Sequence, residues 1–161
     1  MTTLLKLAAI DTLALIMYRK EIQTILGLDS ATRNITHGVY AMDRLPQRKP
    51  GAYVINTDDH DEPGSHWIAV YCENDHVDFM DSYGRPPLDA RLIKFLGANY
   101  DFNNIALQQP MSNACGFYCL YFLLHRARGH SAASIIELLR RSDSDHVVKE
   151  YVYSRYKPIF V

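Results

Sequence analysis

One of the three cysteines in this 161-residue chain has the local setting of a nucleophile. Cys115 follows the loop sequence PMSNA and precedes Gly116 and a long apolar run, so we expect its thiol at the N-terminus of a buried helix. The positive end of a helix dipole stabilises a thiolate, the reactive form of cysteine. Cysteine is also a common small core residue, and Cys72 and Cys119 lie in apolar segments that suit this role. The sequence therefore predicts Cys115 as the nucleophile and the other two thiols as inert packing residues.

A histidine and an aspartate stand at the outer ends of a predicted β-hairpin. The β-rich segments 66–72 and 76–81 are joined by a short polar turn centred near Asn74. In such a hairpin, the sequence numbers of two opposed residues add up to a constant, here about 147 to 149. An odd sum puts His66 and Asp81 on one face of the sheet, within reach of a hydrogen bond that orients the imidazole. A three-residue loop instead gives an even sum and opposite faces, which leaves the two side chains without a joint role.

Two glutamines, Gln108 and Gln109, shortly precede Cys115. A Gln amide and the backbone N–H of the nucleophile can together bind the oxyanion that forms when a thiolate attacks a carbonyl. A Gln pair in a loop means little by itself. The order His66, Asp81, Gln109 and Cys115, each in a suitable local setting, favours a joint catalytic role over four unrelated explanations.

The cysteines do not predict a metal site. Cys115, Cys119 and His125 include no CxxC pair, and helix packing explains their spacing. We therefore predict no metal ligands among the candidate residues.

The segments that would position these residues predict an α+β fold, in which a small, mostly antiparallel sheet is flanked by helices. Segment 117–124 is apolar on all sides and is followed by Arg126, Arg128 and Gly129, which is typical of a buried central helix with Cys115 at its start. The other expected elements are helices at 21–26, 88–96, 131–139 and 144–153 and strands at 52–56 and 103–107, with irregular chain between residues 27 and 51.

Length and composition limit the classes of function. A chain of 161 residues has room for one core of ordinary size, so we expect a single domain over 1–161. Lys and Arg number 17 and Asp and Glu 18, so the formal charge of −1 provides no global field for a polyanion such as DNA. An odd number of cysteines without a secretory cleavage pattern indicates reduced thiols in an intracellular compartment.

The first 18 residues are apolar, with Lys6 and Asp11 as interruptions. The longest uncharged run, 12–18, is far shorter than the roughly 20 residues that a membrane span needs. We expect a buried or partly buried helix over 1–18. Met17 is a second candidate start, which would make residues 1–16 an extension.

The segments GSHWIAVY, DFMDSYG and QQPMSNACGFYC, in this order, resemble the adenovirus processing protease (adenain) family. That family includes proteases of large virus-like DNA transposons and is distantly related to proteases that process ubiquitin-like proteins. The resemblance covers most of the chain but not residues 1–18. It implies a compact cysteine protease in which His66 is the general base, Asp81 orients it, Gln109 contributes to the oxyanion hole and Cys115 attacks.

Three features depart from the adenovirus pattern. Asp81 stands where adenovirus enzymes have Glu and the ubiquitin-like-protein proteases have Asp. Gln109 has the spacing to Cys115 of the latter group, whereas Gln108 has the adenovirus spacing; we prefer Gln109. No cysteine occurs between residues 83 and 114, the region in which adenovirus enzymes tether an activating peptide by a disulfide. An activating peptide or DNA is thus implied by the family alone, and a disulfide tether is not supported.

We predict a cysteine endopeptidase that cleaves viral or virus-like capsid or core precursors for particle maturation. The resemblance implies that cleavage occurs at glycine-containing motifs. Precursor proteins are the expected partners. We expect a monomer that needs no membrane and no cofactor and acts inside the cell, in the host nucleus or the virion. Two alternatives are a deubiquitinase or ubiquitin-like-protein protease on the same scaffold, and a catalytically inactive module that binds coat proteins or DNA.

Overall fold

The computed structural model describes residues 17–160, whose strands form one five-stranded sheet in the order β1-β2-β3-β4-β5. The three central strands pair antiparallel, while each edge strand runs parallel to its neighbour. The strands are β1 (Thr36–Ala41), β2 (Gly51–Asn56), β3 (Trp67–Glu73), β4 (His76–Met80) and β5 (Tyr100–Phe102).

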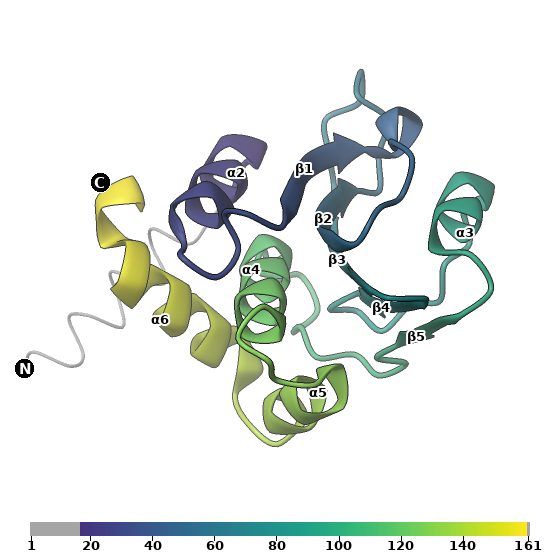
Figure 1. Ribbon diagram of the computed structural model, residues 1–161. Helices are drawn as coiled ribbons and strands as arrows, with labels where there is room; N and C mark the ends of the chain where they lie inside the picture. The colour runs from purple at the N-terminus through teal and green to yellow at the C-terminus, as the bar shows by residue number, and fades with distance from the viewer. Residues whose placement is uncertain (1–16, 161) are drawn as a thin grey trace, which may run out of the picture.

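Helices cover both faces of this sheet (Figure 1). They are α2 (Arg19–Leu28), α3 (Ala90–Leu96), α4 (Cys115–Arg126), α5 (Ala132–Arg140) and α6 (Ser144–Tyr156), with short 3₁₀ helices η1 (Met42–Arg44) and η2 (Lys157–Phe160). Helices α2, α4, α5 and α6 lie on one side, and α3 lies on the other (Figure 1). This arrangement confirms the predicted α+β class and its buried central helix.

Two apolar layers hold the helices against the sheet. One face of the sheet, through residues such as Val54, Ala69 and Met80, packs against α4 and the helices around it. The other face, through residues such as Ile55 and Val70, packs against α3. All six residues of β2 are buried, because both of its faces are covered. Shortening one such core side chain to Ala costs about 2 to 5 kcal/mol.

The hairpin of β3 and β4 has the register that the pairing argument requires. Ala69 pairs with Met80 and Val70 with Phe79, an odd index sum of 149. The turn contains only Asn74 and Asp75, and Asn74 adopts a positive φ of 52° that this residue type tolerates. The hairpin therefore presents His66 and Asp81 on one face, diagonal to each other.

Two segments differ from the sequence-based expectation. Residues 36–41 form β1 instead of irregular chain, because parallel pairing with β2 supplies hydrogen bonds that no local pattern signals. The last strand is at 100–102 rather than 103–107, and it pairs parallel with β4.

The helix expected over 1–18 lies almost entirely in residues 1–16, which are outside the described residues. Its last two residues, Met17 and Tyr18, precede α2. Within residues 17–160, no helix combines the length and apolarity needed to cross a bilayer.

Candidate active site

His66 and Asp81 form a buried hydrogen-bonded pair. His66 lies directly before β3 and Asp81 directly after β4, and Nε2 of the imidazole is 2.8 Å from Oδ1 of the carboxylate. The side chains are only 8% and 7% exposed, respectively. A carboxylate in this position fixes the orientation of the ring and stabilises its protonated form. Because Nε2 faces Asp81, Nδ1 is the nitrogen left for a second partner.

Asp81 is held in place by Tyr83 and Asn103. Its Oδ1 accepts the backbone N–H of Tyr83 at 2.8 Å. Its own N–H donates to Oδ1 of Asn103 at 3.0 Å, and its carbonyl oxygen accepts from the Asn103 amide. The Tyr83 ring also lies beside His66, with the ring centroids 5.0 Å apart. These contacts fix both members of the pair.

Neither Tyr83 nor Asn103 is among the residues that the sequence predicts for the site. Tyr83 could have been found from its place two residues after Asp81, where a backbone N–H commonly caps an aspartate side chain. Asn103 reaches Asp81 only because β5 pairs with β4, and this pairing has no local sequence signal.

Cys115 is the first residue of α4, as predicted, and its side chain interacts with His66. It is partly exposed, whereas the following nine residues of the helix are all buried. Cys115 thus combines a place at the N-terminus of α4 with an interaction with the imidazole of His66. Cys72 and Cys119 are buried, and burial raises the pKa of both thiols, which suits their predicted packing role.

Opposing influences act on the proton of His66. Burial disfavours the charged ring, but hydrogen bonds and negative charge from Asp81 and Cys115 outweigh it and raise the pKa of His66 from 6.5 to about 9. The protonated imidazolium is therefore favoured at neutral pH. An imidazolium beside a cysteine is the arrangement that activates the sulfur for nucleophilic attack.

The two glutamines have different surroundings. Gln108 is buried; its Oε1 accepts from the Ser82 hydroxyl at 2.6 Å, and its Nε2 donates to the Ser112 carbonyl at 2.7 Å. Gln109 is exposed, and its side-chain amide has no hydrogen bond to any other residue within 17–160. Only the Gln109 amide is available to a ligand, and its assignment to an oxyanion hole remains a prediction.

A hydrogen-bond network between α4 and α6 positions the backbone of Gln109. Oδ1 of Asp145, in α6, accepts the N–H of Gln109 at 3.3 Å and the hydroxyl of Tyr118 at 2.6 Å. Tyr118 belongs to α4, and its hydroxyl oxygen also lies 3.1 Å from the carbonyl oxygen of Leu107. The helix that begins with Cys115 is thereby joined to the loop that carries Gln109.

A cleft of about 360 Å³ adjoins Trp67, the residue that follows His66. Met17 lines it, accepts a 3.2 Å hydrogen bond from Nε1 of Trp67 through its carbonyl, and packs against Gly116. A Cβ at Gly116 would lie 3.1 Å from Met17, so the glycine permits this close approach. Tyr40 and Gly64 are among the other residues that line the cleft.

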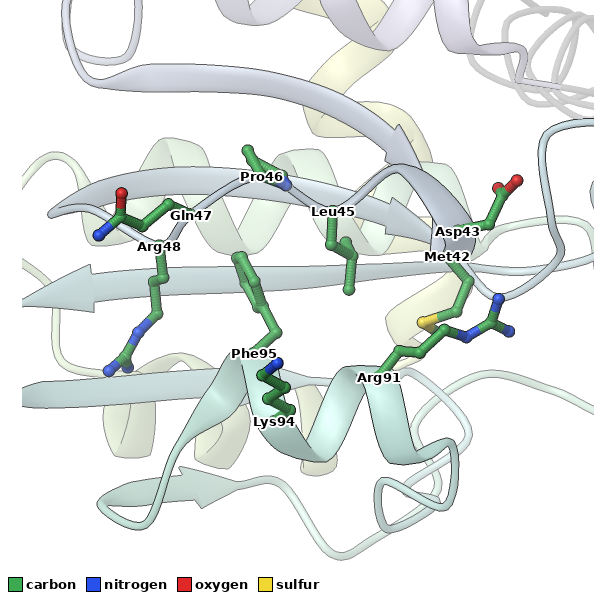
Figure 2. A pocket seen from close by; sticks show the side chains of 9 residues that line it. All are labelled: Met42, Asp43, Leu45, Pro46, Gln47, Arg48, Arg91, Lys94 and Phe95. Atoms are coloured by element: carbon green, nitrogen blue, oxygen red, sulfur yellow. The ribbon is translucent and has the colours of Figure 1, made fainter.

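A larger cavity of about 570 Å³ lies between segment 42–48 and α3 (Figure 2). Side chains such as Leu45 and Phe95 converge on it from opposite sides, with Arg48 and Lys94 at its edge. None of the described residues that line it is a predicted catalytic residue. The described lining of the smaller cleft contains no predicted catalytic residue either, but it includes Trp67, the neighbour of His66 in the chain, and this makes it the better candidate for substrate.

Comparison with known proteins supports the fold. No protein-family profile and no curated protein matches the sequence. A crystal structure of the ASFV pS273R protease is similar, with a TM-score of 0.59 and 17% identity over 85% of this chain and 66% of that chain. A selenomethionine crystal structure of ASFV pS273R protease gives a TM-score of 0.43 and 21% identity over 62% and 42% of the two chains. The first comparison shows that this chain, which spans 66% of that protease's length, shares its fold.

Proposed function

We propose that this protein is a cysteine endopeptidase that uses Cys115, His66, Asp81 and Gln109. The observation that carries the proposal is the buried 2.8 Å pair of His66 and Asp81, whose imidazole also interacts with Cys115 at the start of α4. These three residues come from three separate parts of the chain. Their convergence supplies a nucleophile, a base and an orienting carboxylate.

Each residue has one role in the proposed reaction. The sulfur of Cys115 attacks the scissile carbonyl, and the resulting oxyanion is bound by the Cys115 N–H and the Gln109 amide. His66 donates its proton to the leaving amine, which departs and leaves a thioester. Water then attacks the thioester while His66 accepts its proton, and the carboxylic acid product leaves as His66 returns to the imidazolium form beside the Cys115 thiolate. Asp81 keeps the imidazole oriented throughout.

The proposed substrates are viral or virus-like precursor proteins, cleaved at glycine-containing motifs. Support comes from the resemblance of the sequence to adenain and from the fold shared with a viral protease. The cleft beside Trp67, which has Gly64 in its lining, is the place we assign to the substrate chain.

A ubiquitin-like-protein protease is the second candidate. Two observations favour it: the carboxylate partner of His66 is Asp81, and the unengaged glutamine is Gln109 rather than Gln108. Both features match the proteases of ubiquitin-like proteins.

A cleavage assay tests the proposal. Purified protein is incubated with a peptide that contains a glycine-rich precursor motif and, separately, with a ubiquitin-fold fusion protein. We expect peptide hydrolysis that disappears in Cys115→Ala and persists in Cys72→Ala, the matched control for a thiol away from the site. Cleavage of the fusion alone would support the second candidate. Wild-type protein that cleaves neither substrate and whose Cys115 resists alkylation would contradict both and favour a binding module.

A further inference from the structure

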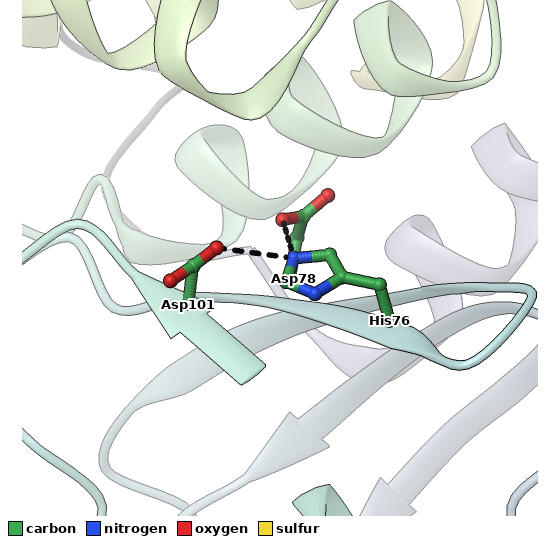
Figure 3. Close-up of side chains that lie close together, drawn as sticks. All are labelled: His76, Asp78 and Asp101. Atoms are coloured by element: carbon green, nitrogen blue, oxygen red, sulfur yellow. Dashed lines mark hydrogen bonds and ion pairs between the residues drawn. The ribbon is translucent and has the colours of Figure 1, made fainter. Parts of the chain in front are cut away.

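Three side chains of metal-ligating type meet at one edge of the sheet. His76 and Asp78 lie on the same face of β4, and Asp101 is the partner of Asp78 across the parallel ladder to β5 (Figure 3). Nε2 of His76 is 3.1 Å from Oδ1 of Asp78 and 3.2 Å from Oδ2 of Asp101. One ligand atom from each of the three residues lies within 4.8 Å of the other two.

These separations fit the coordination shell of a zinc ion. Tetrahedral Zn²⁺ binds nitrogen and oxygen at about 2.0 to 2.2 Å, which places neighbouring ligand atoms about 3.3 Å apart. The separations of 3.1 and 3.2 Å are close to that value, so small side-chain adjustments would admit the ion. A single N–H of His76 cannot align well with two carboxylates at once, whereas a cation between the three atoms can bind all of them.

A partly buried arginine, Arg126, orients Asp78 and leaves the other oxygen of that carboxylate available. Nε of Arg126 donates to Oδ2 of Asp78 at 3.0 Å, so Oδ1 of Asp78 still faces His76. The Arg126 side chain is 11% exposed and also pairs with Glu73. Such a second hydrogen bond is the usual support of a metal-binding carboxylate.

Charge also favours a divalent cation at this edge. With His76 neutral, the carboxylates of Glu73, Asp78 and Asp101 and the guanidinium of Arg126 together carry a net charge of about −2. A bound divalent ion neutralises this group. An imidazole among the ligands selects zinc-class metals over Mg²⁺ and Ca²⁺, which prefer oxygen ligands alone.

We propose that His76, Asp78 and Asp101 form a binding site for one zinc-class divalent metal ion. A cavity of about 510 Å³ between this edge and α5 is lined by both aspartates and provides room for water as the fourth ligand. No local sequence pattern signals this site, because its ligands converge only through strand pairing.

The site is placed to stabilise the candidate active site. A bound ion links Asp78 on β4 to Asp101 on β5. Asp81 follows β4, and Asn103, which holds both backbone polar groups of Asp81, follows β5. Metal binding therefore resists separation of the two strands that position Asp81, without any part in the peptidase chemistry.

Cobalt binding tests the site independently of the proposed peptidase activity. The full chain carrying Cys115→Ser, which removes the exposed thiol, is titrated with Co²⁺ and monitored by visible absorption. We expect one Co²⁺ per chain, the d–d bands of a four-coordinate ion and no thiolate charge-transfer band. Zn²⁺ should displace the cobalt. At 100-fold excess over its dissociation constant, Zn²⁺ should raise the unfolding midpoint by about 8 °C.

Variants on the same background localise the ion. His76→Gln should abolish saturable binding, and Asp101→Asn, at a side chain 83% exposed, should weaken it by more than about tenfold without unfolding the chain. His146→Gln is the matched control, because His146 pairs with the single carboxylate of Glu150 and should leave binding unchanged. The proposal fails if Co²⁺ binding to the Cys115→Ser chain is not saturable, if a thiolate band appears, or if His76→Gln binds cobalt like its parent.

Discussion

The proton on His66 is controlled by two neighbours with negative charge. Burial opposes protonation, yet Asp81 and Cys115 together raise the pKa of His66 to about 9. Because this value exceeds the unfolded value of 6.5, protonation stabilises the fold fully below pH 6.5. That stabilisation is lost as the pH rises through about 9. The same proton is the one that the leaving amine needs.

Peptidase activity should therefore decline as the pH rises through about 9. In Asp81→Asn the ring loses a negative neighbour, so we expect the decline at lower pH and a kcat lower by about 10² to 10⁴. The measurement is the pH profile of kcat/KM for both proteins. An unchanged alkaline limb in Asp81→Asn would show that Asp81 does not control this proton.

The two glutamines should respond in opposite ways to alanine substitution. Gln109→Ala should lower kcat by about 10² to 10³ and leave the unfolding midpoint unchanged, because its exposed side-chain amide makes no hydrogen bond to another described residue. Gln108→Ala removes the partner of Ser82 and should cost about 1 to 3 kcal/mol in the free energy of unfolding. Measurements of kcat and of the free energy of unfolding in urea, made on both variants, distinguish the two roles. The reverse pattern would move the oxyanion role to Gln108.

At the scale of elements, the turn after β4 determines where Asp81 lies. Gly84 has a φ of 68°, and its N–H donates to the carbonyl of Asp81 at 2.8 Å. A Cβ at this position would lie 2.3 Å from the backbone carbon of Ile105. The turn thus tolerates no side chain without displacing the loop that follows β5.

Gly84→Ala should destabilise the fold by at least about 1 to 3 kcal/mol, because it adds backbone strain and a clash with Ile105. It should also lower activity by displacing Asp81. Gly27→Ala is the control: Gly27 lies in α2, a Cβ there would meet no atom within 4 Å, and alanine should stabilise by about 0.5 to 1 kcal/mol. Equal stability changes in urea denaturation would refute the proposed strain at Gly84.

Helices and strands could be predicted from the sequence where a local residue pattern indicates them. The β3–β4 hairpin follows from alternating β-rich segments and a short turn, and the odd index sum of its register places His66 and Asp81 on one face. The apolar run after Cys115 likewise predicts α4. Strand β1 and the position of β5 were missed because each is fixed by parallel pairing with a distant strand. For the same reason, Asn103 and the cluster of His76, Asp78 and Asp101 could not be predicted.

At the scale of the whole molecule, one carboxylate joins the two ends of the described chain. Asp29 follows α2, is 4% exposed, and accepts hydrogen bonds from Arg128 at 2.7 Å and from Tyr156 at 2.6 Å. Burial alone would raise its pKa, but these bonds and the Ala31 N–H outweigh burial and lower the pKa of Asp29 to about 2. The helical layer around α4 therefore depends on the charge of one side chain.

Asp29→Asn should destabilise the protein at neutral pH by about 2 kcal/mol, the worth of a pKa shift of this size. Because the folded pKa lies below the unfolded value of 3.8, the wild-type advantage should be full above pH 3.8 and disappear as the pH falls through about 2. Unfolding free energies of both proteins at several pH values provide the measurement. A difference that persists at the lowest pH would mean that the charge of Asp29 is not the cause.

The proposed chemistry depends on activation of Cys115 by His66, and the rate of thiol alkylation tests this dependence most directly. Wild-type protein and His66→Ala are treated with iodoacetamide at neutral pH, and labelling of each cysteine is followed by peptide mass spectrometry. We predict that Cys115 reacts much faster than Cys72 or Cys119, whose burial raises their pKa values, and that His66→Ala slows Cys115 by at least about tenfold. Activation of Cys115 by His66 would be contradicted if the three thiols were labelled at equal rates, or if His66→Ala left the alkylation rate of Cys115 unchanged.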